Sequence, residues 1–211
     1  MEYIRKTVRN AAVGVGVADN PTNLSVLLKP GCAAAIWRRQ TPPSVQSWLD
    51  LLDPDALPRA QVNLPQNAVA KTIRHICDAS GLPDGKEREW LQDDIALLAG
   101  TFSGLMSAKH LRLRLETVKT DACREFHIDA TTAQLVCTYR GIGTQYGIST
   151  DGREPKRVFT VPTGSPFLLR GTLWTGQPPS GLLHRSPPIE GSGETRLVLI
   201  LDPVREPDQE A

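Results

Sequence analysis

The chain has 211 residues, of which 40% are hydrophobic and 22% charged, and its formal net charge is +1. This length suffices for one well-buried domain with a helical addition. With 24 basic and 23 acidic residues, no net field favours nucleic acid or an anionic membrane, so we expect a small-molecule or protein substrate. No apolar run approaches the roughly 20 residues that cross a bilayer, and no membrane contact is expected.

The four cysteines are far apart and form no C-x-x-C pair: Cys32, Cys77, Cys123 and Cys137. This pattern is typical of reduced thiols rather than of a disulfide framework or a zinc knuckle. The first twenty residues lack the dense apolar stretch of a signal peptide. We therefore predict a cytoplasmic protein.

Helix signals dominate before residue 109. A short helix is expected after the breaker Pro42-Pro43, with Ser44 as its cap. A second helix is predicted from about residue 68 to residue 80, with Gly81 as its stop. The third and clearest runs from about residue 86 to residue 107, where large apolar side chains recur at helical spacing.

After residue 109 the hydrophobic period drops from 3.6 to 2. HLRLRLETV alternates leucine with charged residues, as expected of a strand with one buried face, and AQLVCTYR, FLLRG and TRLVLILD are further strand candidates. Turns rich in glycine and proline separate them, such as GIGTQYG and TGQPPSG. Many short strands favour a β-sandwich or barrel. The predicted organisation is α+β, with a helical region over residues 1–108, a β-core over 109–203 and a flexible tail over 204–211.

Three residues of the β-core could hold a metal ion. His127 and Asp129 are two apart in the string FHID, so in an extended segment their side chains point to the same side. His184, in GLLHRSPP, lies where a short strand meets a rigid turn. Two histidines and one carboxylate form the facial triad of mononuclear Fe(II) sites, and zinc accepts the same ligands. The alternative is a hydrogen-bonded His127–Asp129 pair with His184 packed in a turn.

Arg196 follows His184 by 12 residues, across a glycine-containing loop. If that loop closes a hairpin, Arg196 lies on the partner strand close to His184. A buried guanidinium needs an anionic partner, because an unpaired charge is costly to desolvate. A bound dicarboxylate would provide that partner, and so would an internal acid such as Glu194 or Asp202.

The ordered series H-x-D, distal His and Arg resembles the Fe(II)- and 2-oxoglutarate-dependent dioxygenases, in particular their prolyl-hydroxylase-like branch. The strings RLVLILD, PTGSPFLLRG and LVCTYRGIGTQY resemble core strands of that group. The C-terminal half also resembles a bacterial family of domains of unknown function that shares FHxD, TYRGxGT, LLRG, GLLHRSPP and GETRL. Both resemblances cover roughly residues 109 to 203.

The dioxygenase resemblance implies a double-stranded β-helix, that is, a jelly-roll or cupin-like core, with the helical N-terminal region packed on it. His127, Asp129 and His184 would hold Fe(II), and Arg196 would bind the distal carboxylate of 2-oxoglutarate. Thr138 and Tyr139 are plausible helpers in holding this co-substrate through their hydroxyls. The implied activity is hydroxylation of a substrate C–H bond.

Two rival interpretations come from other classes of protein. One is a zinc-binding β-barrel that uses the same ligands as a store, a sensor or a structural element. The other is a metal-free binding module. No motif in the sequence identifies the substrate.

Overall fold

The computed structural model describes residues 8, 10–121 and 123–204. In chain order, the strands and helices have the following bounds: β1 (Gly14–Ala18), the 3-10 helix η1 (Pro21–Leu28), β2 (Cys32–Trp37), α1 (Pro43–Leu51), β3 (Ala60–Pro65), the 3-10 helix η2 (Gln66–Ala68), α2 (Val69–Ala79), α3 (Lys86–Met106), β4 (His110–Val118), β5 (Ala133–Arg140), β6 (Gln145–Ile148), β7 (Phe159–Thr160), β8 (Phe167–Arg170), β9 (Leu182–Arg185) and β10 (Arg196–Val204).

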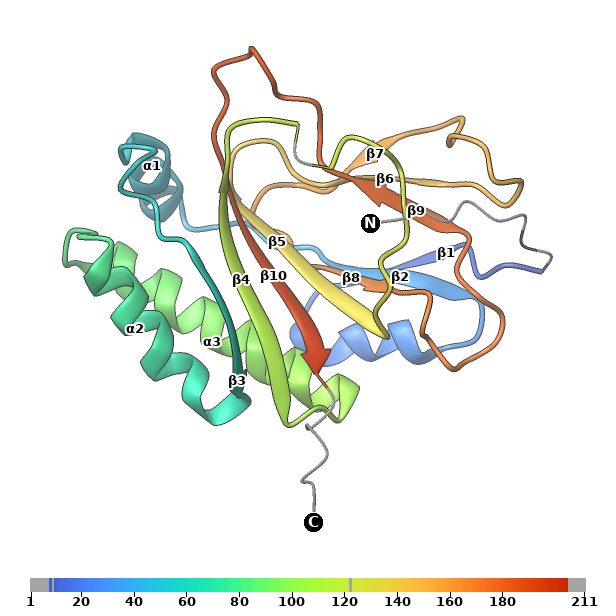
Figure 1. Cartoon of the computed structure of the whole chain (residues 1–211). Coiled ribbons are helices and arrows are strands. Elements are labelled where there is room, and N and C mark those ends of the chain that lie inside the picture. The colour runs from blue at the N-terminus through green and yellow to red at the C-terminus, as the bar shows by residue number, and fades with distance from the viewer. Residues whose placement is uncertain (1–7, 9, 122, 205–211) are drawn as a thin grey trace.

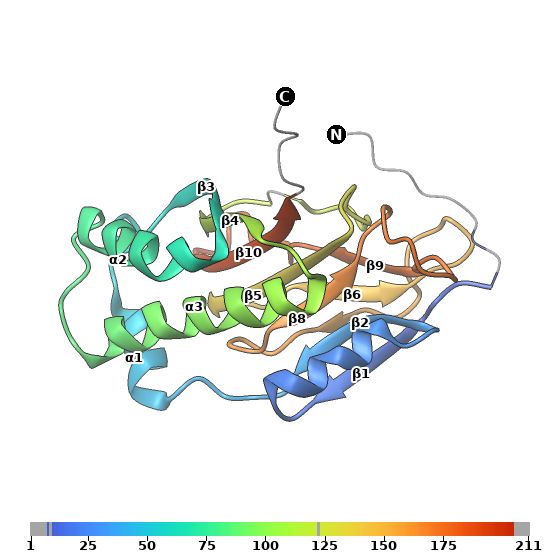
Figure 2. The same ribbon diagram turned by 90° about the horizontal axis from the view of Figure 1, so that it is seen from below.

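Two sheets organise the fold (Figure 1). The large sheet has the strand order β1-β2-β8-β5-β10-β4-β3, and the small sheet has the order β7-β6-β9. Seen from below, α3 and η1 lie across one face of the large sheet, while β6 and β9 lie beyond its other face (Figure 2). The large sheet is therefore the middle layer, and its two faces have different partners.

The helices agree closely with the prediction. The second and third predicted helices correspond to α2 and α3, and α3 ends where Ser107 adopts a left-handed conformation with φ 51°. Gly81, with φ +68°, follows α2 as a stop signal should. Ser44 does not cap α1: the helix begins at Pro43, and its cap position, Pro42, makes no side-chain hydrogen bond. A proline in the first turn suffices, because its missing N–H would have no partner there.

The N-terminal region is mixed rather than helical, which corrects the expectation for residues 1–108. Strands β1 and β2 form one edge of the large sheet and β3 forms the other. The strand β2 has the sequence CAAAIW and is buried over Cys32–Ala35, so it shows none of the polar–apolar alternation on which the strand predictions relied. In contrast, the predicted strands HLRLRLETV and AQLVCTYR have the observed bounds of β4 and β5.

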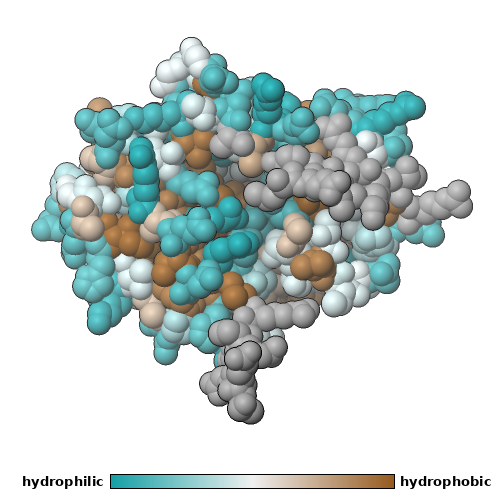
Figure 3. Space-filling view, viewed as in Figure 1, coloured by the Kyte–Doolittle hydropathy of each residue, from teal (hydrophilic) through white to brown (hydrophobic). Residues whose placement is uncertain are grey.

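The two faces of the large sheet bury separate hydrophobic cores. The larger core joins the helices to the sheet and includes Leu98 and Phe102 of α3 with Leu113 and Leu199 of the strands. The smaller core lies between the sheets and includes Val136, Phe167, Leu182 and Val198. The outer surface seen in the direction of Figure 1 is mainly hydrophilic, with apolar residues in small patches (Figure 3).

The C-terminal tail predicted over 204–211 falls almost entirely outside the described residues. Its first residue, Val204, is the last residue of β10 and pairs with His110 of β4. Within the described part of the chain, no helix is long and apolar enough to span a membrane.

Candidate metal centre

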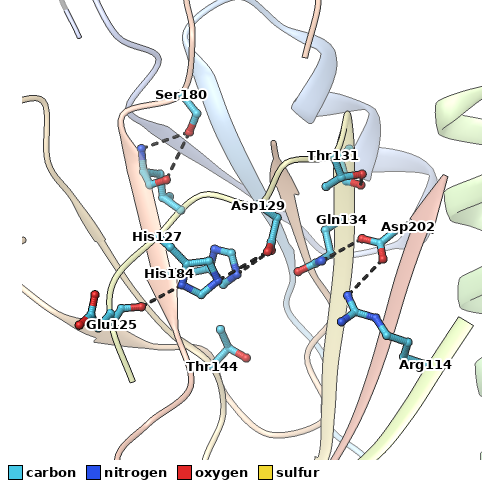
Figure 4. A network of polar contacts seen from close by, with 12 residues as sticks. Arg114, Glu125, His127, Asp129, Thr131, Gln134, Thr144, Ser180, His184 and Asp202 are labelled. Carbon is cyan, nitrogen blue, oxygen red and sulfur yellow. Dashed lines mark hydrogen bonds and ion pairs between the residues drawn. The ribbon is translucent and has the colours of Figure 1, made fainter. Parts of the chain in front are cut away.

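The side chains of His127, Asp129 and His184 meet at one point between the two sheets (Figure 4). His127 Nε2 lies 3.6 Å from Asp129 Oδ1, and His184 Nε2 lies 3.2 Å from Asp129 Oδ2. The two imidazole rings have their centroids 4.5 Å apart. Each of the three residues offers one potential ligand atom, and these three atoms lie within 4.8 Å of one another. The structure thus brings together the three predicted metal ligands.

Backbone pairing holds the two histidines side by side. His184 lies on β9, and His127 pairs with it through an isolated antiparallel bridge. The N–H of each histidine donates to the carbonyl of the other, and both N···O distances are 3.0 Å. Directly opposed residues of an antiparallel pair present their side chains on the same face. Asp129, two residues beyond His127, adds the carboxylate to that face.

Hydrogen bonds set the orientation and charge of the cluster. His127 Nδ1 lies 2.8 Å from the carbonyl oxygen of Glu125, which turns Nε2 toward Asp129. Burial would raise the pKa of Asp129, but the hydrogen bonds from His127 and His184 outweigh it and hold that pKa well below its usual value. Burial lowers the pKa of His184. Burial acts in the same direction on His127, but the hydrogen bonds with Asp129 and Glu125 outweigh it and raise the pKa of that imidazole. The site therefore offers an ionised carboxylate between two imidazoles whose pKa values are shifted in opposite directions.

The donor set fits a divalent transition metal. Ligand atoms bound at about 2.1 Å lie roughly 3.0 to 3.4 Å apart around an octahedral or tetrahedral ion. The separations of 3.2 and 3.6 Å between each histidine and Asp129 are close to this range. Two imidazoles and one carboxylate suit both iron and zinc, and three protein ligands leave positions for other molecules.

Arg196 lines the same cavity as the three candidate ligands. The cavity has a volume of about 90 Å³ and lies between the large sheet and the small sheet. Its walls are formed mainly by alternate residues of β4, β5 and β10, together with residues around His127 and His184. The lining residues are Arg114, Glu116, Val118, Cys123, His127, Asp129, Gln134, Val136, Thr144, His184, Arg185, Ser186, Arg196, Val198 and Ile200.

The Arg196 side chain is only 1% exposed, yet no carboxylate of the described residues forms an ion pair with it. Its Nε donates to the carbonyl oxygen of Ile142 at 2.6 Å, and one terminal nitrogen donates to the hydroxyl of Thr138 at 3.2 Å. Burial lowers the pKa of Arg196 to about 10, against the opposing charges of Glu194 and Glu116. The guanidinium is still protonated at neutral pH, and a bound anion would relieve the cost of burying it.

The two internal acids considered as partners of Arg196 are engaged elsewhere. Glu194 Oε1 accepts from the N–H of Ile142 at 2.9 Å. Asp202 accepts from Arg112 and from Gln134, at the far end of β10. The internal salt bridge that competed with a ligand-binding role is thus absent among the described residues.

The expected hairpin between His184 and Arg196 is not formed, and this prediction was wrong. His184 is on β9, which pairs with β6 in the small sheet, whereas β10 pairs with β4 and β5 in the large sheet. The loop between β9 and β10 therefore crosses from one sheet to the other. Arg196 nevertheless reaches the cavity of His184, because the two sheets face one another across it.

Glycines allow the loop after β5 to pass over Arg196. Gly141 has φ +80°, and a Cβ there would lie 2.8 Å from the Thr195 carbonyl oxygen and 3.0 Å from Arg196 Cγ. A Cβ on Gly143 would lie 1.8 Å from the carbonyl oxygen of Val161. Only glycine fits such close approaches. The string GIGT thereby places the Ile142 carbonyl where the Arg196 Nε can donate to it.

The structure brings Thr138 to the site but not Tyr139. Neighbouring residues of a strand point to opposite faces, and Thr138 faces the cavity side, where it contacts Arg196. Tyr139 points to the helical face, where its fully buried hydroxyl donates to Asp94 of α3 at 2.6 Å. The predicted role of Tyr139 in holding a co-substrate is therefore not carried further.

Sequence reasoning missed several residues of the cavity. The Thr144 hydroxyl is 3.5 Å from Arg196, and Gln134 and Arg114 line the opposite end. Alternation along β5 could have identified Gln134, because residues 134, 136 and 138 share a face. Thr144 lies in a segment interpreted as a turn, where no periodicity assigns a direction to a side chain.

Comparison with known proteins supports a dioxygenase-like fold. The chain is similar to dioxygenase for auxin oxidation 1 from Arabidopsis thaliana in a binary complex with 2-oxoglutarate, with a TM-score of 0.54 and 10% identity over 94% of this chain and 95% of that one. The rice dioxygenase for auxin oxidation gives a TM-score of 0.48 and 12% identity, over 92% and 84% of the respective chains. At such low identity the likeness concerns the fold alone, a mixed α/β arrangement with a large sheet.

No curated protein matches the sequence. Residues 18–202 match the family described as protein of unknown function (DUF1826), and the match runs from the last residue of β1 through β2 to the candidate metal centre and most of β10. Because this match covers most of the chain, the protein belongs to the DUF1826 family.

Proposed function

We propose that this protein is an Fe(II)- and 2-oxoglutarate-dependent dioxygenase that hydroxylates a C–H bond of its substrate. The observation that carries the proposal is the buried Arg196 guanidinium, which shares one cavity with the His127, Asp129 and His184 cluster and has no carboxylate partner among the described residues. A metal-binding protein of another kind would need the three ligands but would gain nothing from a buried, unpaired cation. A dicarboxylate that bridges the metal and Arg196 accounts for both.

Each residue of the site has a distinct task in this proposal. His127, Asp129 and His184 would hold Fe(II), and the Glu125 carbonyl fixes the orientation of the His127 ring. Arg196 would bind the distal carboxylate of 2-oxoglutarate, with Thr138 and Thr144 orienting the guanidinium. Fe(II) and 2-oxoglutarate would supply the activation of O2 for insertion into a C–H bond. The apolar residues Val136, Val198 and Ile200 keep that space dry.

The double-stranded β-helix belongs to the same proposal. It is supported by the large sheet facing the small one across the candidate centre, and by the fold likeness to a dioxygenase. Zinc bound at the same three ligands is the rival interpretation. A storage or structural zinc site does not require a buried cation such as Arg196, so we prefer the oxygenase. Membership of the prolyl-hydroxylase-like branch remains a prediction from sequence resemblance.

Anaerobic titration with Fe(II) and 2-oxoglutarate tests the proposal. We expect a visible charge-transfer band when both are present, and no such band with either alone. In Arg196→Met the affinity for 2-oxoglutarate should fall roughly 30-fold or more, since losing one partner of a buried charge pair costs about 2 kcal/mol or more. The affinity for Fe(II) alone should be retained, because Arg196 contacts none of the three ligands.

Arg59→Met, at an exposed position outside the cavity, is the matched control and should leave both affinities unchanged. Tight, colourless zinc binding with no response to 2-oxoglutarate would instead establish the zinc protein. Failure of the purified protein to bind any divalent metal would overturn the proposal.

A further inference from the structure

A second polar cluster, which includes Gln134, Arg114 and Asp202, lies near the metal-ligand cluster (Figure 4), and Gln134 and Arg114 line the same cavity as Arg196. Asp202, near the C-terminal end of β10, is 2% exposed and uses both of its carboxylate oxygens. Oδ1 accepts from Gln134 Nε2 at 2.9 Å, and Oδ2 accepts from Arg112 and Arg114 at 3.0 and 3.1 Å. Strand register explains the gathering, since Ile200 pairs with Arg114 and Asp202 with Arg112 on β4.

The Asp202 carboxylate fixes which way the Gln134 amide points. An ionised carboxylate only accepts hydrogen bonds, so the NH2 group of Gln134 must face it. The amide oxygen is then turned the other way, toward Asp129 and the metal-ligand cluster (Figure 4). No donor among the described residues binds this oxygen, although the Gln134 residue is only 5% exposed. Gln134 thus presents an oriented, unused acceptor to the cavity.

Arg114 packs against the same cluster. Its Nε is buried and has no partner among the described residues, while its terminal nitrogens pair with Asp202 and, at 3.7 Å, with Glu116. Asp202 pairs with both Arg112 and Arg114, and Glu116, whose charge also acts on Arg196, lies 3.7 Å from Arg114. The Arg196 end differs, since its cation has no carboxylate partner. An anion is favoured there, whereas a head group without net charge is favoured beside Gln134.

Apolar side chains separate the two polar ends. Val136, Val198 and Ile200 line the cavity between Arg196 and Gln134, on the same faces of β5 and β10. The metal-ligand cluster faces this stretch from the other wall. An aliphatic carbon held against these residues would lie beside the candidate metal centre, while its polar head group reached Gln134.

We propose that Gln134 is a specificity-determining residue for the primary substrate, and that Asp202 is a positioning residue that orients it. The substrate class is a small aliphatic molecule, or an aliphatic side chain, whose head group carries no net charge and donates an N–H or O–H to Gln134 Oε1. This assignment rests on the proposed function for the reaction, but the binding preference can be measured without it.

Four five-carbon probes separate the contributions of donor and charge. Pentanamide is neutral and norvaline zwitterionic, and both carry N–H donors; pentanoate and pentan-2-one carry none. Ligand-observed NMR would measure their affinities in metal-free protein and in protein loaded with zinc and 2-oxoglutarate. We expect pentanamide and norvaline to bind about tenfold more tightly than pentan-2-one in both states, since one buried hydrogen bond contributes about 1.4 kcal/mol. The same difference from pentanoate is expected only in the protein loaded with zinc and 2-oxoglutarate, where Arg196 no longer attracts the carboxylate.

Substitutions test which residues cause the preference for probes with an N–H donor. Gln134→Leu should weaken pentanamide to the level of pentan-2-one and leave pentan-2-one itself unchanged; Gln134→Met provides the same comparison if the leucine variant does not fold. Asp202→Asn should shift the preference toward pentan-2-one, because asparagine can donate to Gln134 and let its amide turn. A purely structural role for Asp202 would weaken all probes alike. Gln61→Leu, at an exposed position of β3, is the control.

The outcomes distinguish this proposal from the oxygenase proposal. If Fe(II) and 2-oxoglutarate fail to bind while the donor preference persists, the proposed reaction is wrong and the subsite stands. If they bind and Gln134→Leu leaves the probe preference unchanged, the subsite assignment alone is overturned. Absence of binding of every probe to the wild-type protein would also overturn it.

Discussion

The same strands form both faces of the large sheet, but one face packs against the helices and the other lines the cavity. On β5, Cys137 and Tyr139 point toward α3, while Gln134 and Val136 line the cavity and Thr138, on the same face, contacts Arg196. On the helical face, Asp94 accepts both terminal nitrogens of Arg39, at 2.5 and 2.7 Å, and the Tyr139 hydroxyl. The buried charges of Asp94 and Arg39 therefore satisfy one another.

On the cavity face, two buried polar groups lack a partner of the kind they require. Arg196 has no carboxylate, and Gln134 Oε1 has no donor, among the described residues. Leaving a buried polar group unpaired costs roughly 1 to 3 kcal/mol, so such groups are kept where a ligand completes them. Buried polar atoms without a partner also occur outside the cavity, at Thr41 and Arg170, so incomplete polarity indicates a functional site only where several such groups line one cavity, as Arg196 and Gln134 do.

Removing a metal ligand should have the largest effect and should be confined to the cavity face. In His184→Ala, we expect the affinity for Fe(II) to fall more than about 100-fold, because changes that only reorient a ligand already cost about 10- to 100-fold. Metal content and titration calorimetry would measure this. His75→Ala, at an exposed position of α2, is the control and should bind metal normally. Equal metal content in the wild type and His184→Ala would contradict the assignment of His184.

Breaking the Asp94–Arg39 ion pair on the helical face should have the opposite effect: stability falls while metal binding is kept. Asp94→Ala leaves the buried Arg39 guanidinium unpaired, and we expect a loss of about 3 to 5 kcal/mol in the free energy of unfolding. Metal affinity of the folded fraction should change little, since Asp94 lies across the sheet from the ligands. Chemical denaturation provides the measurement, with the exposed neighbour Asp93→Ala as control. A large loss of metal affinity without loss of stability would show that the two faces are coupled.

The smallest effect is expected from Tyr139→Phe, which separates the two faces at a single residue. Burial raises the pKa of Tyr139 well above its usual value, so the hydroxyl is protonated and donates to Asp94. Removing it should cost about 1 to 2 kcal/mol of stability, while Arg39 still satisfies Asp94. Binding of 2-oxoglutarate should be unchanged. Weaker 2-oxoglutarate binding in Tyr139→Phe would show that this tyrosine does contribute to binding the co-substrate.

Local signals predicted the elements whose sequences alternate or repeat regularly. The bounds of β4 and the extent of α3 followed from hydrophobic period, whereas β5, which is buried on both faces, was predicted as a short apolar segment between turns. The strand β2 gave no such signal, since a buried alanine run carries no periodicity. The short strands β6 and β7 fell among turn-forming residues and are held by pairing with one another and with β9. Such pairing depends on the distant chain rather than on local sequence.

The sequence by itself determined the chemistry available: two histidines and a carboxylate with metal-ligand spacing, and an arginine embedded in an apolar strand. Tertiary structure alone decided which of these groups meet. Arg196 reaches the metal cluster because two sheets face each other, and not through the local hairpin that its spacing suggested. The same packing sends Tyr139 away and brings Gln134 in, since a strand fixes only that neighbours point oppositely, and the layers on either side determine what each face meets.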